Sequence, residues 1–299
     1  MIYFITILVL SGMLSGFVSG NNLSAAVGNI IGSRIVSREM GLIIGIAGFS
    51  LGLLIEGHLL KDSIGKIMPQ TPIFIIFALA VSLFIFIFAT WARIPLSLTM
   101  ALVGTGLGIS LRYGYHFNTG YIYLVIAAWV FAPLISIILS IVLNRIMLKK
   151  SSINPWAVPK VLKPLLVIVS FLTAFTLGAN TLGLIAALTG DNLSDLSIMT
   201  FGIIFGSIFL SKGVIKRVSQ EMYSMRYVSA FVSLLVSSLL VETATFFSVP
   251  LSNTQTLTSS ILGSGISYKI KAIFLKPFMI VVVMWIISPL VGLLLGYAL

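Results

Sequence analysis

The sequence predicts an all-α polytopic membrane protein of about ten transmembrane segments, arranged as two inverted-topology repeats with discontinuous helices. Composition supports the membrane assignment, because 59% of the 299 residues are hydrophobic, only 8% are charged, and the mean hydropathy is +1.16. A soluble domain of this length would need many more polar residues to cover its surface. Short polar motifs that occur twice in the chain support the repeats.

Ten apolar stretches occupy most of the chain, and most are close to the ~20 residues needed to cross a ~30 Å hydrocarbon layer. They cover residues 2–19, 40–60, 72–92, 96–111, 119–148, 164–188, 195–211, 227–248, 252–267 and 277–299. The first is expected to be a span and not a cleaved signal peptide, because no basic region precedes it. If all ten cross, most of the 18 Lys and Arg residues lie in cytoplasmic loops and both termini lie outside. If 96–111 forms a re-entrant loop instead of a crossing, the excess of Lys and Arg in cytoplasmic loops becomes weaker.

A polar linker at 149–163 separates a first repeat, 1–148, from a second repeat, 164–299. Both halves contain the same motifs in the same order. "SGNNLSAAVGNIIG" at 19–32 matches "LGANTLGLIAALTG" at 177–190, and "PLSLT" at 95–99 matches "PLSNT" at 250–254. The prolines of the second pair precede "WVFAPL" and "WIISPL" by 34 and 35 residues. Five crossings per half would invert the second repeat relative to the first.

The two pentapeptides predict a binding site for an anion. Proline breaks a helix and favours a new helix start, which presents unpaired N–H groups and the positive end of the helix dipole. Ser97 and Thr99 add hydroxyl groups from one half, and Ser252 and Thr254 add them from the other. A single motif of this kind more often marks a kink with hydroxyls bonded to their own backbone. Two motifs at matched positions favour a site near the bilayer midplane.

These motifs resemble those of the inorganic phosphate transporter (PiT) family, the phosphate and sulfate permeases, whose repeats contain a G-A-N-D-x-x-N motif and then a P-V-S-T-T-H motif. "GNN" at 20–22 and "GAN" at 178–180 resemble the first motif, and the two pentapeptides resemble the second. The resemblance covers nearly the whole chain in order. It implies a secondary transporter of phosphate, or in some members sulfate, usually coupled to Na+ or H+ and without another cofactor.

The resemblance also implies which residues form the sites. The expected anion ligands are Ser97, Thr99, Ser252, Thr254, Asn22 and Thr181, and Asn21 and Asn180 are expected to serve cation coupling. Glu242 is a third expected coupling residue, proposed from its own chemistry and not from the resemblance. Asn22 and Thr181 stand where the family has aspartate, and the motif's histidine is replaced by Met100 and Gln255.

Glu242 is expected to bind a proton in place of the lost aspartates. An ionisable group within an apolar span costs at least ~2.5 kcal/mol and is a candidate functional residue by default. An equally weighted alternative puts Glu242 near the outer interface or beside a hydrogen-bond donor. For Glu56, at the end of its span, the interface is the expected place.

Two anions are candidates for the transported substrate, phosphate and sulfate. Hydrogen phosphate carries an O–H that requires an acceptor, whereas sulfate has no proton to donate, so a cavity of donors without a carboxylate fits sulfate well. The resemblance favours phosphate, which is placed first; a sulfate permease of the same fold and an anion channel are the alternatives.

Other function classes find no support in the sequence. Cysteine is absent, so disulfides and thiol catalysis are excluded. No nucleotide-binding motif, nucleophile with a base, or cluster of metal ligands indicates an enzyme or an ATP-driven pump. The net charge of +11 is typical of loops that set topology and does not indicate nucleic acid binding. The expected partners are phosphate or sulfate and the lipid bilayer of the plasma membrane, with a homodimer left open.

Overall fold

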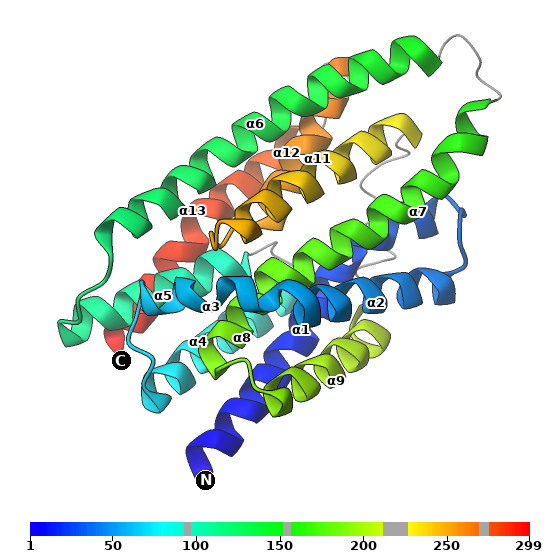
Figure 1. Ribbon diagram of the computed structural model, residues 1–299. Coiled ribbons are helices and arrows are strands. Elements are labelled where there is room, and N and C mark those ends of the chain that lie inside the picture. Colours follow the sequence, from blue (N-terminus) through cyan, green and yellow to red (C-terminus); the bar gives the residue numbers. More distant parts are fainter. Residues whose placement is uncertain (93–96, 152–156, 212–226, 269–274) are drawn as a thin grey trace.

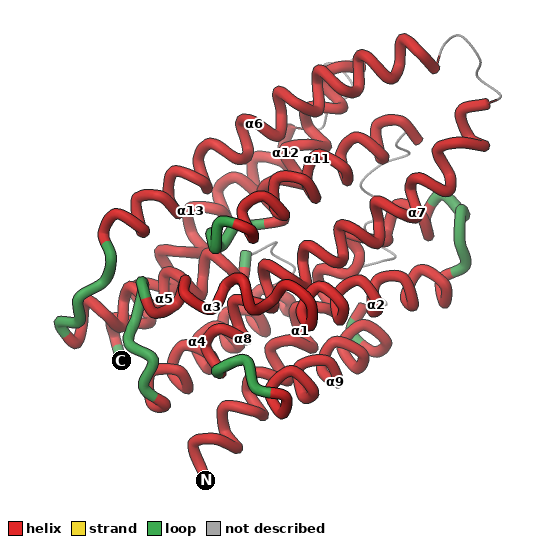
Figure 2. Tube along the Cα trace, viewed as in Figure 1, coloured by secondary structure: helices red, strands yellow, loops and turns green. Residues whose placement is uncertain are grey.

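The computed structural model describes residues 1–92, 97–151, 157–211, 227–268 and 275–299, and every regular element within them is a helix (Figures 1 and 2). The helices are α1 (Ile2–Gly32), α2 (Arg38–Glu56), η1 (Gly57–Leu60), α3 (Lys61–Gly65), α4 (Pro72–Ala92), α5 (Leu98–Tyr113), α6 (Thr119–Ser151), α7 (Ala157–Leu177), η2 (Gly178–Leu182), α8 (Gly183–Thr189), α9 (Leu193–Phe209), α11 (Tyr227–Phe246), α12 (Asn253–Tyr268) and α13 (Leu275–Ala298). The linker expected at 149–163 is helical at both ends, in α6 and α7, and its residues 152–156 lie outside the described part.

A helix occupies each of the ten apolar stretches that the sequence predicts. Among the described residues, six helical segments are long and apolar enough to cross a membrane. They are Ile2–Leu23, Arg38–Gly65, Thr119–Lys149, Pro159–Thr189, Tyr227–Phe246 and Val281–Ala298. α4 and α9 supply shorter apolar segments, and α5 and α12 have only 16 residues each. The helical membrane architecture is therefore found, while the count of ten crossings stays a prediction.

The short helices begin and end at residues whose chemistry explains the boundary. Ser97 has an extended backbone and its side chain accepts from the N–H of Met100, which caps α5. Gly114 and Gly190 end α5 and α8 with φ values of 68° and 102°, a left-handed conformation that glycine adopts without strain. Between α7 and α8 the chain widens into the π-helical η2, a type of distortion that is frequent at functional sites.

The helices pair across the two halves of the chain. α1 packs on α9 and α2 on α7, while α5 packs on α13 and α12 on α6. In Figure 1, α6, α11, α12 and α13 lie on one side of the molecule and α1, α2 and α9 on the other, with α7 between them. Several of these contacts occur at glycine: a Cβ atom at Gly206 would overlap the carbonyl oxygen of Gly16, and one at Gly178 would overlap that of Phe49. Small residues allow this close approach of membrane helices.

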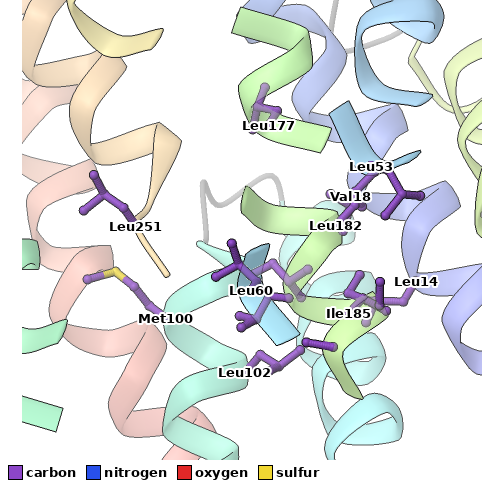
Figure 3. Packing of buried hydrophobic residues seen from close by; sticks show 14 of the residues in the cluster. Leu14, Val18, Leu53, Leu60, Met100, Leu102, Leu177, Leu182, Ile185 and Leu251 are labelled. Atoms are coloured by element: carbon purple, nitrogen blue, oxygen red, sulfur yellow. The ribbon is translucent and has the colours of Figure 1, made fainter. Parts of the chain in front are cut away.

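An apolar core surrounds the point where α1, α2, α5 and η2 converge. Figure 3 shows Leu14 and Val18 of α1 near Leu182 and Ile185, with Leu102 of α5 below them. Leu14, Val18 and Leu182 have no exposed surface, and Leu102 is 1% exposed. Since lipid chains are as apolar as these side chains, this packing holds the helices by van der Waals contact more than by exclusion of water.

Candidate functional site

A small cavity lies where α1, α5, η2 and α12 meet. Its lining consists of Asn22, Ser97, Leu98, Thr99, Leu177, Thr181, Ser252, Asn253 and Thr254. All six side chains expected to bind the anion are in this set. They come from both halves of the chain, from positions up to 232 residues apart (Asn22 and Thr254). The sequence motifs that match each other therefore meet in space.

The first wall of the cavity is the start of α5. Ser97 and Thr99 are buried, with 5% and 2% of their surfaces exposed, and Ser97 precedes the first helical residue. The Ser97 Oγ lies 3.4 Å from the Met100 N, and the Ser97 carbonyl accepts the N–H of Ala101. The earliest amides of the helix have no acceptor within it, so they face the region before its start. Pro95 and the neighbouring Arg93 lie outside the described residues.

The opposite wall is the start of α12. Ser252 directly precedes the helix, and its Oγ lies 2.9 Å from the Thr254 Oγ1. The Ser252 carbonyl accepts the N–H groups of Gln255 and Thr256 at 3.1 and 3.3 Å. Like the start of α5, this end of the helix presents amide N–H groups and the positive end of a dipole.

Trp129 fixes the chain just before α12. Its Nε1–H donates to the carbonyl of Pro250 at 2.9 Å, and both groups are buried. Trp129 belongs to the first half and Pro250 to the second, so the proline and tryptophan motifs that recur along the sequence contact each other across the halves. Gln255 also reaches this tryptophan, through a 3.4 Å contact between its Nε2 and the Trp129 carbonyl.

Asn22 and Thr181 complete the polar lining. Asn22 lies within the long helix α1 with 9% of its surface exposed, and Thr181 lies in the π-helical η2 with 4% exposed. Both stand where the family motif has aspartate, and each contributes a side chain able both to donate and to accept hydrogen bonds.

Asn180 does not line the cavity but holds one of its walls. Its Nδ2 donates to the Thr245 Oγ1 at 3.0 Å and to the Val249 carbonyl at 3.1 Å, and its Oδ1 accepts the N–H of Leu251 at 3.0 Å. Both ends of the amide are therefore occupied by the protein, and this buried side chain ties η2 to the connection between α11 and α12. Asn21, the other asparagine expected to serve cation coupling, is half-buried beside Asn22 and is also outside the lining.

Glu242 lies in α11 away from the cavity and beside a second carboxyl group. Its side chain lies next to that of Glu56, at the end of α2. One oxygen of each carboxyl, Oε2, is buried without a partner in the described part of the protein. The sequence predicts Glu56 at the membrane interface, and its contact with a residue 186 positions later could not be foreseen from either local sequence.

The sequence missed three residues of the lining: Leu98, Leu177 and Asn253. Asn253 is the informative one, because it is polar and belongs to the second pentapeptide. Its neighbours Ser252 and Thr254 stand out in the sequence because hydroxyls occupy the same places in the first half. Asn253 gives no such signal, since Leu98 stands at its matched place.

The lining is polar and carries no charged side chain among the described residues. Hydroxyl and amide groups, with two helix N-termini, make a surface rich in hydrogen-bond donors. An arrangement of this kind stabilises an anion through N–H and O–H groups and helix dipoles. No group of three or more His, Cys, Asp or Glu residues that could hold a metal ion is found in the described ranges.

Comparisons with known proteins agree with this chemistry. A family model described as "Phosphate transporter family" matches residues 18–296. A Methanocaldococcus jannaschii protein named "Putative phosphate permease" is 25% identical to this chain, over 97% of this chain and 94% of its own length. A solved structure described as "The sodium-dependent phosphate transporter" shares the fold with a TM-score of 0.87, at 16% identity, and the match covers 100% of this chain and 98% of that chain. The resemblance seen in the motifs is confirmed, the chain is a transporter and not an enzyme, and it is an integral membrane protein that belongs to the phosphate transporter family.

Proposed function

We propose that this chain is a secondary transporter that carries inorganic phosphate, coupled to an ion, and binds the anion in the cavity between α5 and α12. The observation that carries the proposal is the convergence of Ser97 and Thr99 with Ser252 and Thr254 in one cavity, each pair at the start of a helix. Family membership makes phosphate the first choice of cargo.

Two inverted repeats account for the way the helices pair. The first element of each half packs on the second element of the other: α1 on α9, and α7 on α2. The fourth element of each half packs on the fifth of the other: α5 on α13, and α12 on α6. Such reciprocal pairing is expected when a pseudo-twofold axis relates the halves, and rocking of one half against the other would expose a central site to each side in turn.

The cavity is suited to an oxyanion because its groups donate hydrogen bonds without requiring a cationic side chain. Each helix start adds amide N–H groups aligned with a dipole, which is favourable for negative charge. Charge-assisted hydrogen bonds to such groups are stronger than neutral ones, at about 1.5–3 kcal/mol each. Release stays feasible because the contacts are individually modest and distributed over both halves.

Uptake into proteoliposomes tests the proposal. Labelled phosphate should enter in a saturable way and exchange with internal phosphate. We expect Ser97→Ala and Ser252→Ala each to lower uptake at least about tenfold, because each removes a hydroxyl from the cavity wall. Ser264→Ala is the matched control, since Ser264 is a buried hydroxyl of α12 outside the cavity. Normal uptake in both cavity variants would remove the proposed site, and single-channel currents would favour an anion channel.

The coupling ion is Na+ or H+. The similar solved structure is that of a sodium-dependent phosphate transporter, which supports Na+. The proximity of Glu242 and Glu56 supports H+, because two carboxylates side by side repel each other and a proton on one of them removes that repulsion. We place the proton site at Glu242, with Asn180 and Asn21 as residues that position the neighbouring wall of the cavity.

Lys163 of α7 and Arg145 of α6, two of the helices beside α11, lie far from Glu242. α7 runs parallel to α11, because Thr173 contacts Ser238 and, further along both helices, Asn180 contacts Thr245. The same offset places Glu242 at the height of Leu177. Lys163 is fourteen residues earlier in α7, about 20 Å along the helix. Arg145 follows Asn144 of α6, which contacts Ser229 at the opposite end of α11. Neither cation is placed to neutralise the carboxyl pair.

Separate ion gradients distinguish the two coupling ions. If protons are coupled, Glu242→Gln should abolish the dependence of uptake on a pH gradient while exchange of labelled phosphate continues. Glu39→Gln, an exposed carboxyl at the start of α2, is the matched control and should respond to the gradient as the parent protein does. A Glu242→Gln protein that still follows the pH gradient would end the proton assignment, and a dependence on Na+ alone would favour sodium.

The remaining expectations stay predictions. A sulfate permease of the same fold is the main alternative, and uptake of labelled sulfate in the same vesicles addresses it. The prediction that both termini lie outside follows from the charge distribution alone, and placement in the plasma membrane also stays a prediction. A homodimer is left to a measurement of oligomeric state in detergent.

A further inference from the structure

Asn253 is the first helical residue of α12 and one of the most enclosed polar groups in the cavity wall. Only 3% of its surface is exposed, and it contributes to the lining between Ser252 and Thr254. Its Nδ2 is fully buried and has no hydrogen-bond partner among the described residues. A buried amide donor without an acceptor costs about 1–3 kcal/mol, so its presence beside a cavity calls for an acceptor.

The first half of the chain offers no equivalent donor. Leu98 stands at the matched place in the first pentapeptide and is also part of the lining, 2% exposed. The other polar positions of the two pentapeptides are identical, Ser with Ser and Thr with Thr. Asn253 is therefore the polar side chain that makes the α12 wall different from the α5 wall.

We infer that Asn253 binds the carried anion directly, donating its Nδ2–H to an anion oxygen, and that it biases the site toward fully ionised tetrahedral oxyanions. This inference rests on the proposed function and names the class of substrate that the same cavity prefers. The amide lies at the start of a 16-residue helix, where the N-terminal amides and the dipole act on the same oxygen.

The preference follows from the number of acceptors in the cavity. Hydrogen phosphate must place its remaining O–H against an acceptor, while sulfate needs donors only. No carboxylate lines the cavity in the described residues, so an O–H of the anion has only hydroxyl and amide oxygens to meet. The Asn253 donor adds to this excess of donors. Replacing it with an acceptor of the same shape should reverse the bias, because a site that pairs with an O–H rejects an analogue that lacks one.

Two substitutions at this position test the inference. Asn253→Leu installs the residue that the first half has and removes the donor; the KM for phosphate uptake should rise about tenfold, with the maximal rate changed less. Asn253→Asp replaces the donor by an acceptor with nearly the same shape. We expect this substitution to lower the affinity for sulfate at least about tenfold more than the affinity for phosphate, measured by competition of unlabelled sulfate against labelled phosphate.

Two further variants separate a direct contact from a structural effect. Leu98→Asn adds a second amide to the opposite wall and should lower the concentration of sulfate that halves phosphate uptake. Thr256→Val removes a buried hydroxyl one turn from the start of α12, outside the lining, and should leave the ratio of sulfate to phosphate affinity unchanged.

Stabilisation by ligand gives a second measurement that does not depend on transport. Phosphate and sulfate should each raise the thermal unfolding midpoint of the purified parent protein, and the concentration dependence gives the affinity. The Asn253→Leu protein should need about ten times more of either anion for the same shift. An unfolding midpoint near that of the parent without anion shows that the variant is folded.

The outcomes for Asn253 and for the proposed function are distinct. If the parent protein neither takes up phosphate nor is stabilised by phosphate or sulfate, the proposed function fails. If the parent binds and transports, but Asn253→Leu retains the parent affinities and Asn253→Asp retains the parent ratio of sulfate to phosphate, the inference about Asn253 is wrong.

Discussion

The helices α5 and α12 start with nearly the same five residues and have the same length, yet different forces hold them in place. α5 packs against α13 through glycines on both helices. A Cβ atom at Gly104 or Gly108 would overlap the carbonyl of Pro289 or Leu293, and one at Gly292 would overlap that of Ala101. The two backbones therefore touch directly, with no space for any side chain.

α12 has one glycine of this kind, Gly263, whose added Cβ atom would overlap the Ile137 carbonyl of α6, and a series of hydroxyl groups also joins α12 to its neighbours. Ser136 of α6 lies 2.5 Å from the Ser260 Oγ, Ser237 of α11 lies 2.8 Å from the Thr256 Oγ1, and Ser233 lies 3.0 Å from the Ser264 Oγ. Asn144 of α6 adds a 3.0 Å bond from its Nδ2 to the Ser264 carbonyl. These side chains form a hydrogen-bonded layer on three helices, which we call the hydroxyl layer.

The difference teaches that a duplicated motif determines where a helix starts but not what stabilises it. Backbone contact at glycine tolerates no added atom, so the α5 side should respond sharply to substitution. Hydrogen bonds between membrane helices average about 0.6 kcal/mol each, so the hydroxyl layer should lose stability in small steps. Substitutions on the two sides should therefore differ in the size of their effects.

Gly108→Ala should give the largest effect. The added Cβ would overlap the Leu293 carbonyl and lie 2.7 Å from the Tyr297 backbone nitrogen, so α13 must move away. Overpacking of this kind costs roughly 1–3 kcal/mol, and the rigid backbone partner places it at the upper end. We expect a clear fall in the thermal unfolding midpoint of the purified protein, together with reduced phosphate uptake.

Gly106→Ala is the matched control on the same helix. Its added Cβ would meet the side chains of Ile67 and Met68 at 3.0 and 3.2 Å, and side chains can adjust where backbone cannot. Its unfolding midpoint should stay much closer to that of the parent. Equal midpoints for the two alanine variants would show that backbone contact is not what holds α5.

Asn180→Ala should lower the stability by an intermediate amount, because the connection that precedes α12 is held by this one amide side chain. The substitution leaves the Leu251 N–H and the Val249 carbonyl without their partner, and unpaired buried groups cost about 1–3 kcal/mol. The connection before α12 would loosen and displace Ser252. We expect lower stability and a higher KM for phosphate.

Thr245→Val serves as the comparison for Asn180, since it removes one of the three partners and leaves both backbone groups bonded. It should lower the unfolding midpoint less and leave the KM near that of the parent. A KM that rises equally in both variants would mean that Asn180 does not act by positioning the start of α12.

Much of the fold was predictable because its signals are local or duplicated. Apolar stretches located the helices, and the proline and hydroxyl motifs located the starts of α5 and α12. The resemblance to the family motif brought Asn22 and Thr181 into the same set as Ser97 and Ser252, because a family motif carries long-range information that one segment lacks. The six expected ligands consequently line one cavity.

The unpredicted features depend on partners that are distant in the sequence and differ between the halves. Nothing in the local sequence indicates that Gly108 would face Leu293. The contact between Glu56 and Glu242 was missed because the two residues lie in different halves of the chain. The place of Asn253 in the lining was missed because its counterpart in the first half, Leu98, is apolar. The count of ten crossings stays a prediction, because α5 and α12 are shorter and more polar than ordinary membrane spans. Both properties are expected of helices that line the proposed polar site.

Ser264→Ala should give the smallest loss of stability of these substitutions and is the counterpart, on the α12 side, of Gly108→Ala on the α5 side. The substitution removes one contact of the hydroxyl layer, that between Ser264 and the Ser233 hydroxyl, while the Ser264 carbonyl keeps its bond from Asn144. We expect a loss of about 0.6 kcal/mol and unchanged phosphate uptake. A double-mutant cycle with Ser233→Ala measures the pair itself, and a coupling energy as large as the Gly108→Ala effect would contradict the division between a rigid α5 side and a hydroxyl-bonded α12 side.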